Sequence, residues 1–122
     1  MTLTFLLITS FWMNAASQPM AGVWRGDSVC ATDAPSCRNE TVVYYIKSVP
    51  DKPQVMFVQA DKIVAGKAIT MGAGEWEYDA TGKTLTLRTE QRSWRLQAAQ
   101  DQIEGVLTLA DGTVFRKMTL KR

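Results

Sequence analysis

Hydrophobic and polar residues alternate along most of the chain after residue 21, with the period of two that is typical of strands buried on one face. In the segment 93–98, for example, Trp94, Leu96 and Ala98 take every second position and polar residues fill the positions between them. The pattern predicts strands at 22–30, 40–48, 54–60, 67–71, 74–79, 83–89, 92–98, 102–109 and 113–121.

Turn-forming residues separate the predicted strands. Pro, Gly and Asp occur at residues 50–53, 80–83 and 110–113, where hairpin turns are expected. The region 61–73 is harder to divide, because Gly66, Gly72 and Gly74 indicate a bulge or a sharp bend. Residues 67–79 can equally form one long bent strand.

The number and spacing of the strands predict an all-β fold. About eight short antiparallel strands joined by hairpin turns, with no amphipathic helix, favour a small closed up-and-down barrel, because closure removes the exposed edges of a flat sheet. A two-sheet sandwich is the alternative. With 122 residues in total, residues 18–122 are expected to form one barrel domain.

The first 17 residues differ from the rest of the chain. Leu3 to Met13 form an apolar run without charge, and Ala15 and Ser17 fit the small −3 and −1 positions of a signal-peptidase site. Residues 1–17 are therefore interpreted as a signal peptide, with a mature chain from Gln18 in the periplasm or secreted, and with no stable membrane insertion after cleavage. No Lys or Arg precedes the apolar run, which leaves open whether Met1 is the true start.

A membrane anchor and a buried first element are the alternatives for this segment. The apolar part falls short of the roughly 20 residues that a spanning helix needs. The two cysteines, Cys30 and Cys37, agree with export, because an even number in a short exported chain favours a disulfide. The six intervening residues include turn formers, so this bond is expected to pin a loop.

Composition removes several classes of function. The chain has no histidine, which excludes Ser-His-Asp and Cys-His catalysis and histidine-ligated metals. Two cysteines cannot supply a four-thiolate site, and we expect no metal and no cofactor. The net charge of +2 is too small to favour nucleic acid as a partner. We therefore expect a protein that is not an enzyme.

Three acidic residues are the main candidates for catalysis, and they are better explained as a solvent-exposed face. Glu75, Glu77 and Asp79 alternate with Trp76 and Tyr78 on one predicted strand. Carboxylates two residues apart on a strand lie about 7 Å apart, a spacing that glycosidases also use. However, such an acid pair needs a cleft and a raised pKa, whereas acids opposite aromatics are typical of a half-buried strand.

The segment Gly22-Val23-Trp24 carries a resemblance to a known family. A Gly-x-Trp in the first strand, with an arginine on the last strand, resembles the lipocalin and wider calycin pattern. In that family the arginine packs over the tryptophan, which here implies a structural pair of Trp24 and Arg116. The chain is shorter than a typical lipocalin and lacks its C-terminal helix.

Two further resemblances concern exported bacterial proteins. Residues 24–30, 35–37 and 40–44 look like segments of exported proteins without an assigned activity. The size, the early Gly-x-Trp and the single cysteine pair are similar to small periplasmic metalloprotease inhibitors. In those inhibitors the mature N-terminal segment, here 18–21, enters the protease cleft.

Aromatic residues on the apolar faces of their strands are candidates for a ligand site. If the barrel has an internal cavity, we expect Tyr44, Trp76 and Trp94 to line it. Two functions follow: a barrel that binds a small apolar or amphipathic ligand, or a protein-interaction module such as a protease inhibitor. The first predicts an unfilled interior, whereas the second predicts a packed interior and an extended N-terminus.

Overall fold

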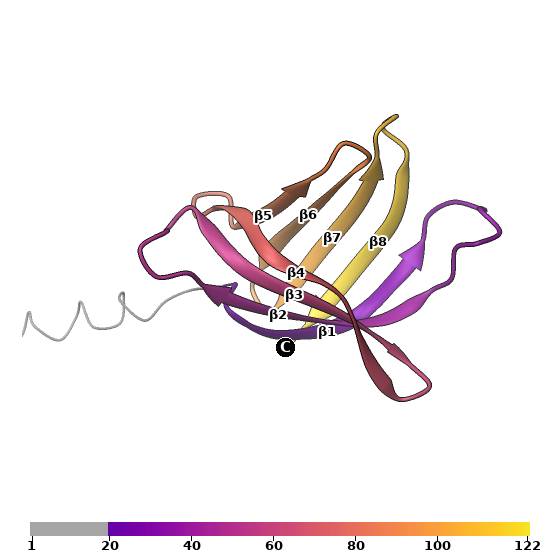
Figure 1. The fold of residues 1–122 in the computed structure, drawn as a ribbon, viewed down its shortest axis with the longest axis horizontal. Helices are drawn as coiled ribbons and strands as arrows, with labels where there is room; N and C mark the ends of the chain where they lie inside the picture. Colours follow the sequence, from indigo (N-terminus) through magenta and orange to yellow (C-terminus); the bar gives the residue numbers. More distant parts are fainter. Residues whose placement is uncertain (1–19) are drawn as a thin grey trace, which may run out of the picture.

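A computed structural model describes residues 20–122 of the chain. These residues form a single sheet of eight antiparallel strands (Figure 1). The strands are β1 (Gly22–Cys30), β2 (Glu40–Ser48), β3 (Val55–Val64), β4 (Lys67–Asp79), β5 (Thr84–Arg88), β6 (Arg92–Ala99), β7 (Gln102–Leu109) and β8 (Val114–Lys121). Each strand pairs with the next, and β1 pairs with β8, so the predicted closed up-and-down barrel is confirmed.

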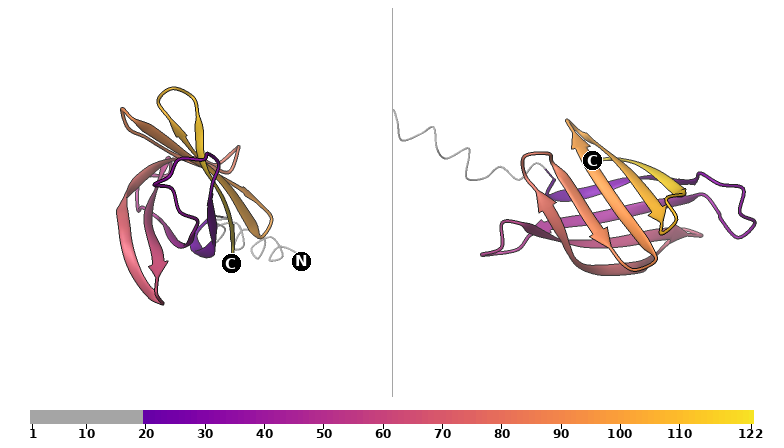
Figure 2. Two further views of the ribbon diagram at one scale, coloured as in Figure 1. Left: turned by 90° about the vertical axis from the view of Figure 1, so that its right-hand side faces the viewer. Right: turned by 90° about the horizontal axis from the view of Figure 1, so that it is seen from above.

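The barrel closes between its first and last strands, which lie side by side in Figures 1 and 2. Their pairing runs from Arg25 opposite Lys121 to Cys30 opposite Arg116. Gly26 stands opposite Leu120 at this junction and lets the two backbones approach closely. Since every backbone edge then has a partner strand, the sheet has no open edge.

The long β3–β4 hairpin is where the structure departs most from the predicted strand limits. Strand β3 continues to Val64, beyond the predicted end at residue 60. The predicted strands 67–71 and 74–79 are one strand, β4, which is the alternative that the glycines left open. Strand β4 stays paired with β3 through Gly72 and Gly74. The irregularity is a shift in the β3–β4 register between Ala60 and Asp61 of β3.

The up-and-down order places the connections at two opposite ends. One end carries the loop between β1 and β2 and the turns that follow β3, β5 and β7. The β1–β2 loop and the β3–β4 hairpin both project toward the right of Figure 1. The other end carries the remaining turns, and we call it the closed end because side chains fill it.

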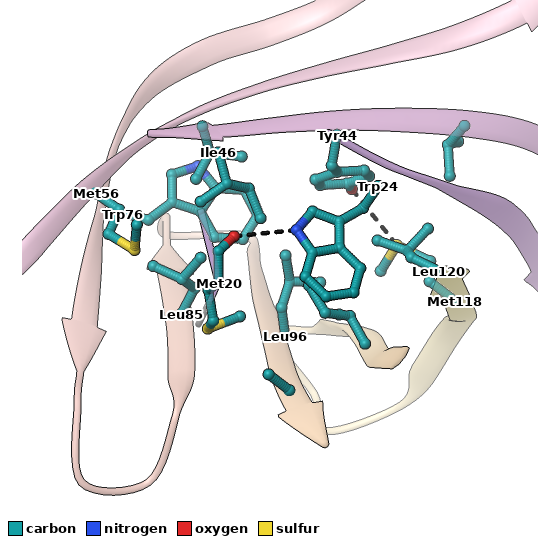
Figure 3. Packing of buried hydrophobic residues seen from close by; sticks show 14 of the residues in the cluster. Met20, Trp24, Tyr44, Ile46, Met56, Trp76, Leu85, Leu96, Met118 and Leu120 are labelled. Carbon is teal, nitrogen blue, oxygen red and sulfur yellow. Dashed lines mark hydrogen bonds between the residues drawn. The ribbon is translucent and has the colours of Figure 1, made fainter. Parts of the chain in front are cut away.

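Trp24 occupies the centre of the closed end. Its side chain is fully buried among residues that include Met20, Leu96 and Leu120 (Figure 3). The indole Nε1 donates a hydrogen bond to the carbonyl oxygen of Met20 at 3.0 Å. The chain that enters β1 therefore folds over the tryptophan and blocks this end of the barrel.

The arginine that packs over Trp24 is Arg122, and the predicted pair of Trp24 and Arg116 is wrong. The Arg122 guanidinium lies 4.3 Å from the centre of the tryptophan ring, within the range of a cation–π contact. Register explains the difference: Lys121 is opposite Arg25, so Arg122 follows beside Trp24, whereas Arg116 is opposite Cys30 at the other end of β1.

The disulfide between Cys30 and Cys37 is present and confirms the predicted pairing. It closes the β1–β2 loop just after β1 ends. The backbone N–H of Cys30 also donates to Oδ1 of Asn39 at 2.9 Å, so the loop is held at both of its sides.

Two expectations concern the signal peptide and membrane insertion. The proposed signal peptide, residues 1–17, and the predicted start of the mature chain at Gln18 lie outside the described residues. Within residues 20–122, the structure has no helix of the length and apolar character needed to span a membrane.

Candidate ligand cavity

A cavity of about 590 Å³ opens at the end of the barrel opposite Trp24. All eight strands contribute to its wall. The volume lies in the range of about 300–1,000 Å³ that is usual for small-molecule sites. The interior is thus divided into a packed closed end and an unfilled open end.

The three aromatic residues predicted to line a cavity are brought together in its wall. Tyr44 and Trp76 meet edge to face, with ring centres 6.3 Å apart. Trp76 and Trp94 lie at an angle of 50°, with ring centres 6.4 Å apart. The geometry is that of a continuous aromatic wall extending from the core to the half-buried Trp94.

Small residues of β4 account for part of the open space. Gly72 and Gly74 line the cavity opposite Ala60 and Val58 of β3. A Cβ atom added at either glycine would meet no atom within 4 Å. The sequence pattern predicted only a bend at these glycines, although inward-facing glycines on a barrel strand can also indicate open space.

The Tyr44 hydroxyl is the most deeply buried ionisable group of the cavity wall. It donates a hydrogen bond to Sδ of Met118 at 3.4 Å (Figure 3). Burial, together with a smaller effect of the nearby Glu40 carboxylate, raises its pKa to about 12, and Arg116 partly opposes these effects. Tyr44 is therefore a neutral donor at physiological pH and cannot serve as a base.

We expect this raised pKa to make the barrel less stable in alkali. Between pH 10 and 12 an unfolded chain would lose the Tyr44 proton while the folded chain retains it. The free energy of unfolding should be unaffected by Tyr44 below pH 10 and should fall as the pH rises through this window, by about 3 kcal/mol in total. Urea unfolding from pH 9 to 11.5 should show a shallower decline in Tyr44→Phe than in the wild type. Parallel curves would contradict the assignment.

Arg116 connects the mouth of the cavity to the disulfide loop. Its guanidinium donates to the hydroxyl and carbonyl oxygens of Ser28, at 3.1 and 3.3 Å, and to the carbonyl oxygen of Arg38 at 2.8 Å. The Glu40 carboxylate lies 3.7 Å away. These contacts satisfy the hydrogen-bonding groups of a positively charged side chain that would otherwise be costly to bury.

Arg92 is a cavity residue that sequence analysis did not select. It lies on β6 two residues before Trp94, so both side chains face the mouth. Met71 and Phe115 were missed in the same way. Alternation along β6 could have identified Arg92 as inward-facing, but its place beside a cavity depended on the other strands that form the wall.

The acidic residues of β4 are exposed, as predicted, and Glu75 also borders the cavity. Glu75, Glu77 and Asp79 are exposed, whereas Trp76 is buried and Tyr78 half-buried. Glu75 pairs with Lys52 at 3.4 Å, and the Asp79 carboxylate accepts hydrogen bonds from the turn that follows β4. In the part of the chain that the structure describes, no three His, Cys, Asp or Glu side chains come together to hold a metal ion.

The closed eight-stranded meander fits a lipocalin-like barrel of the calycin type. No protein-family model matches the chain, and no curated protein matches it. Among solved structures it is similar to the S-type phycobiliprotein lyase CPES from Guillardia theta, with a TM-score of 0.42 and 13% sequence identity over 93% of this chain and 89% of the lyase chain.

Proposed function

We propose that this protein is an exported, non-catalytic barrel that binds a small apolar or amphipathic ligand in the cavity at its open end. The observation that carries the proposal is the division of the interior: one end is filled around Trp24, and the other leaves about 590 Å³ open. The disulfide beside the mouth supports a location in an oxidising compartment outside the cytoplasm.

The composition of the wall indicates what the ligand is like. Tyr44, Trp76 and Trp94 offer apolar ring surface, and Met71 adds a flexible apolar side chain at the mouth. Mostly apolar walls with few polar groups are typical of sites that gain affinity by burying apolar surface. The chain has no histidine, so catalysis that depends on a histidine acid, base or nucleophile is excluded.

The inhibitor alternative fits the described residues less well. It requires an extended N-terminal segment, yet Met20 is fully buried and its carbonyl oxygen accepts the Trp24 hydrogen bond. The carbonyl oxygen of Ala21 accepts a hydrogen bond from Arg122 at 2.9 Å. Both residues would have to leave the barrel before they could enter a protease cleft.

Filling the cavity from β4 tests the proposal. We expect the uncharged fluorophore N-phenyl-1-naphthylamine to bind the wild type with increased emission, and Gly74→Leu to weaken this binding at least about tenfold. The new side chain starts in open space, so the fold should remain intact. Fluorescence titration measures the affinity, and circular dichroism checks the fold.

Ala68→Leu is the matched control, because it adds the same side chain to an exposed position of β4 that does not line the cavity. Its affinity for the fluorophore should equal that of the wild type. Absence of binding to the wild type, or equal binding by folded Gly74→Leu, would overturn the proposed cavity site.

A further inference from the structure

We propose that the ligand carries an anionic group, of which a carboxylate is the simplest example, and that Arg92 binds this group at the mouth of the cavity. The inference rests on the proposed function and names the chemical class of its ligand. The charged and hydroxyl-bearing side chains of the cavity wall are the basis of the inference.

Four charged residues line the cavity, and three of them already have partners. Arg116 and Glu40 form an ion pair at 3.7 Å. Glu75 is paired with Lys52 at 3.4 Å. Among residues 20–122, the guanidinium of Arg92 has no hydrogen-bond or ion-pair partner, so its positive charge is the uncompensated one.

The deeper polar groups are also occupied. The Tyr44 hydroxyl donates to Met118, and the Ser28 hydroxyl accepts a hydrogen bond from Arg116. No buried side-chain nitrogen or oxygen of the described residues lacks a hydrogen-bond partner. A polar ligand group placed beside Tyr44 or Arg116 would therefore lose its water and compete with a hydrogen bond that already exists, which is unfavourable. The ligand must place its apolar body inside and its polar group at the mouth.

The position of Arg92 suits it to this role. Its backbone is fixed in the β5–β6 turn: its N–H donates to Oγ1 of Thr89 at 3.1 Å, and its carbonyl oxygen accepts from the N–H of Thr89 at 2.8 Å. The side chain is exposed beside Trp94. A guanidinium on a fixed backbone can donate two parallel hydrogen bonds to a carboxylate, a geometry that an ammonium group lacks.

Three ligands with the same ten-carbon chain test the inference: decanoate, decanol and decylamine. Each displaces N-phenyl-1-naphthylamine from the protein at pH 7 in low salt, below its solubility limit. We expect the wild type to bind decanoate about 3- to 10-fold more tightly than decanol, with decylamine weakest, since the ion pair is partly exposed to water. The preference should diminish in high salt.

Substitutions at Arg92 locate the preference. Arg92→Gln should remove the advantage of decanoate and leave decanol binding unchanged, Arg92→Lys should retain part of it, and Arg92→Glu should favour decylamine. Arg95→Gln is the matched control, because it removes the same charge from the outward face of the same strand. Its preference should equal that of the wild type.

The outcomes separate the two proposals. Equal binding of decanoate and decanol by the wild type would overturn the anionic ligand while leaving the cavity site in place. An equal loss in Arg92→Gln and Arg95→Gln would show that net charge, and not Arg92, selects the ligand, which would also overturn the inference. Failure of all three compounds and of the fluorophore to bind would overturn the proposed function itself.

Discussion

Replacing Trp24 by alanine is expected to lower the free energy of unfolding by about 3–5 kcal/mol. The indole is fully buried at the closed end, and its removal leaves a cavity between Met20 and Leu120 that the closed sheet cannot collapse to fill. The substitution also leaves the Met20 carbonyl oxygen without its donor and removes the ring beneath Arg122. Urea denaturation followed by circular dichroism measures the loss.

Trp94→Ala is the control for the stability loss expected in Trp24→Ala. Trp94 is the same residue type but half-buried in the cavity wall. Its truncation should cost less than half as much stability and should weaken ligand binding, whereas Trp24→Ala should affect stability first. Equal losses of stability would show that the interior is not divided into a packed end and an open end.

The second large effect is expected at the barrel closure. In Gly26→Ala the new Cβ atom would overlap the carbonyl oxygen of Thr119 and lie 2.9 Å from the Cα of Leu120. These are backbone atoms of the paired strand β8, so no side chain can rotate away to relieve the overlap. We expect a loss at or above about 3 kcal/mol, the upper end of the usual range for overpacking, or no folded protein.

Gly72→Ala tests whether this effect comes from close approach or from glycine itself. Gly72 is also an inward-facing glycine on a paired strand, but a Cβ atom there meets nothing within 4 Å. Alanine at this position should leave stability unchanged or raise it by about 0.5 kcal/mol, because it restricts the unfolded chain. Thermal unfolding of both variants should give opposite or clearly unequal shifts; similar destabilisation would contradict the role of the β1–β8 junction.

The two stability predictions concern the part of the molecule that makes a cavity possible. A barrel with one end filled and its seam closed has a wall that cannot collapse inward. The open space beside Trp76 can then persist in spite of the close packing that protein interiors normally reach. Stability at the closed end and binding at the open end are therefore expected to respond to different substitutions.

The sequence by itself determined the strands, their antiparallel order and the disulfide. Alternation along segments such as 93–98 identifies the buried face without any knowledge of the partner strand, because the side-chain period of a strand is a local property. Turn residues fix the ends of hairpins in the same local way. The cysteines lie close enough in sequence that a turn brings them together.

Only the tertiary structure decided which arginine packs over Trp24. Arg116 and Arg122 are an even number of residues apart, so alternation places both on the same face and cannot separate them. The register between β1 and β8 makes the choice, because it is set by the packing of the whole closed sheet. The resemblance to the calycin pattern suggested Arg116 instead of Arg122 for the same reason.

The cavity was also decided by the tertiary structure. The sequence placed Tyr44, Trp76 and Trp94 on inward faces, but such residues fill a barrel as readily as they line a space. Whether space remains depends on what stands across the interior, and here the opposing residues include Gly72, Gly74 and Ala60. Inward direction is a local property of a strand, whereas empty volume is a property of side chains from all eight strands together.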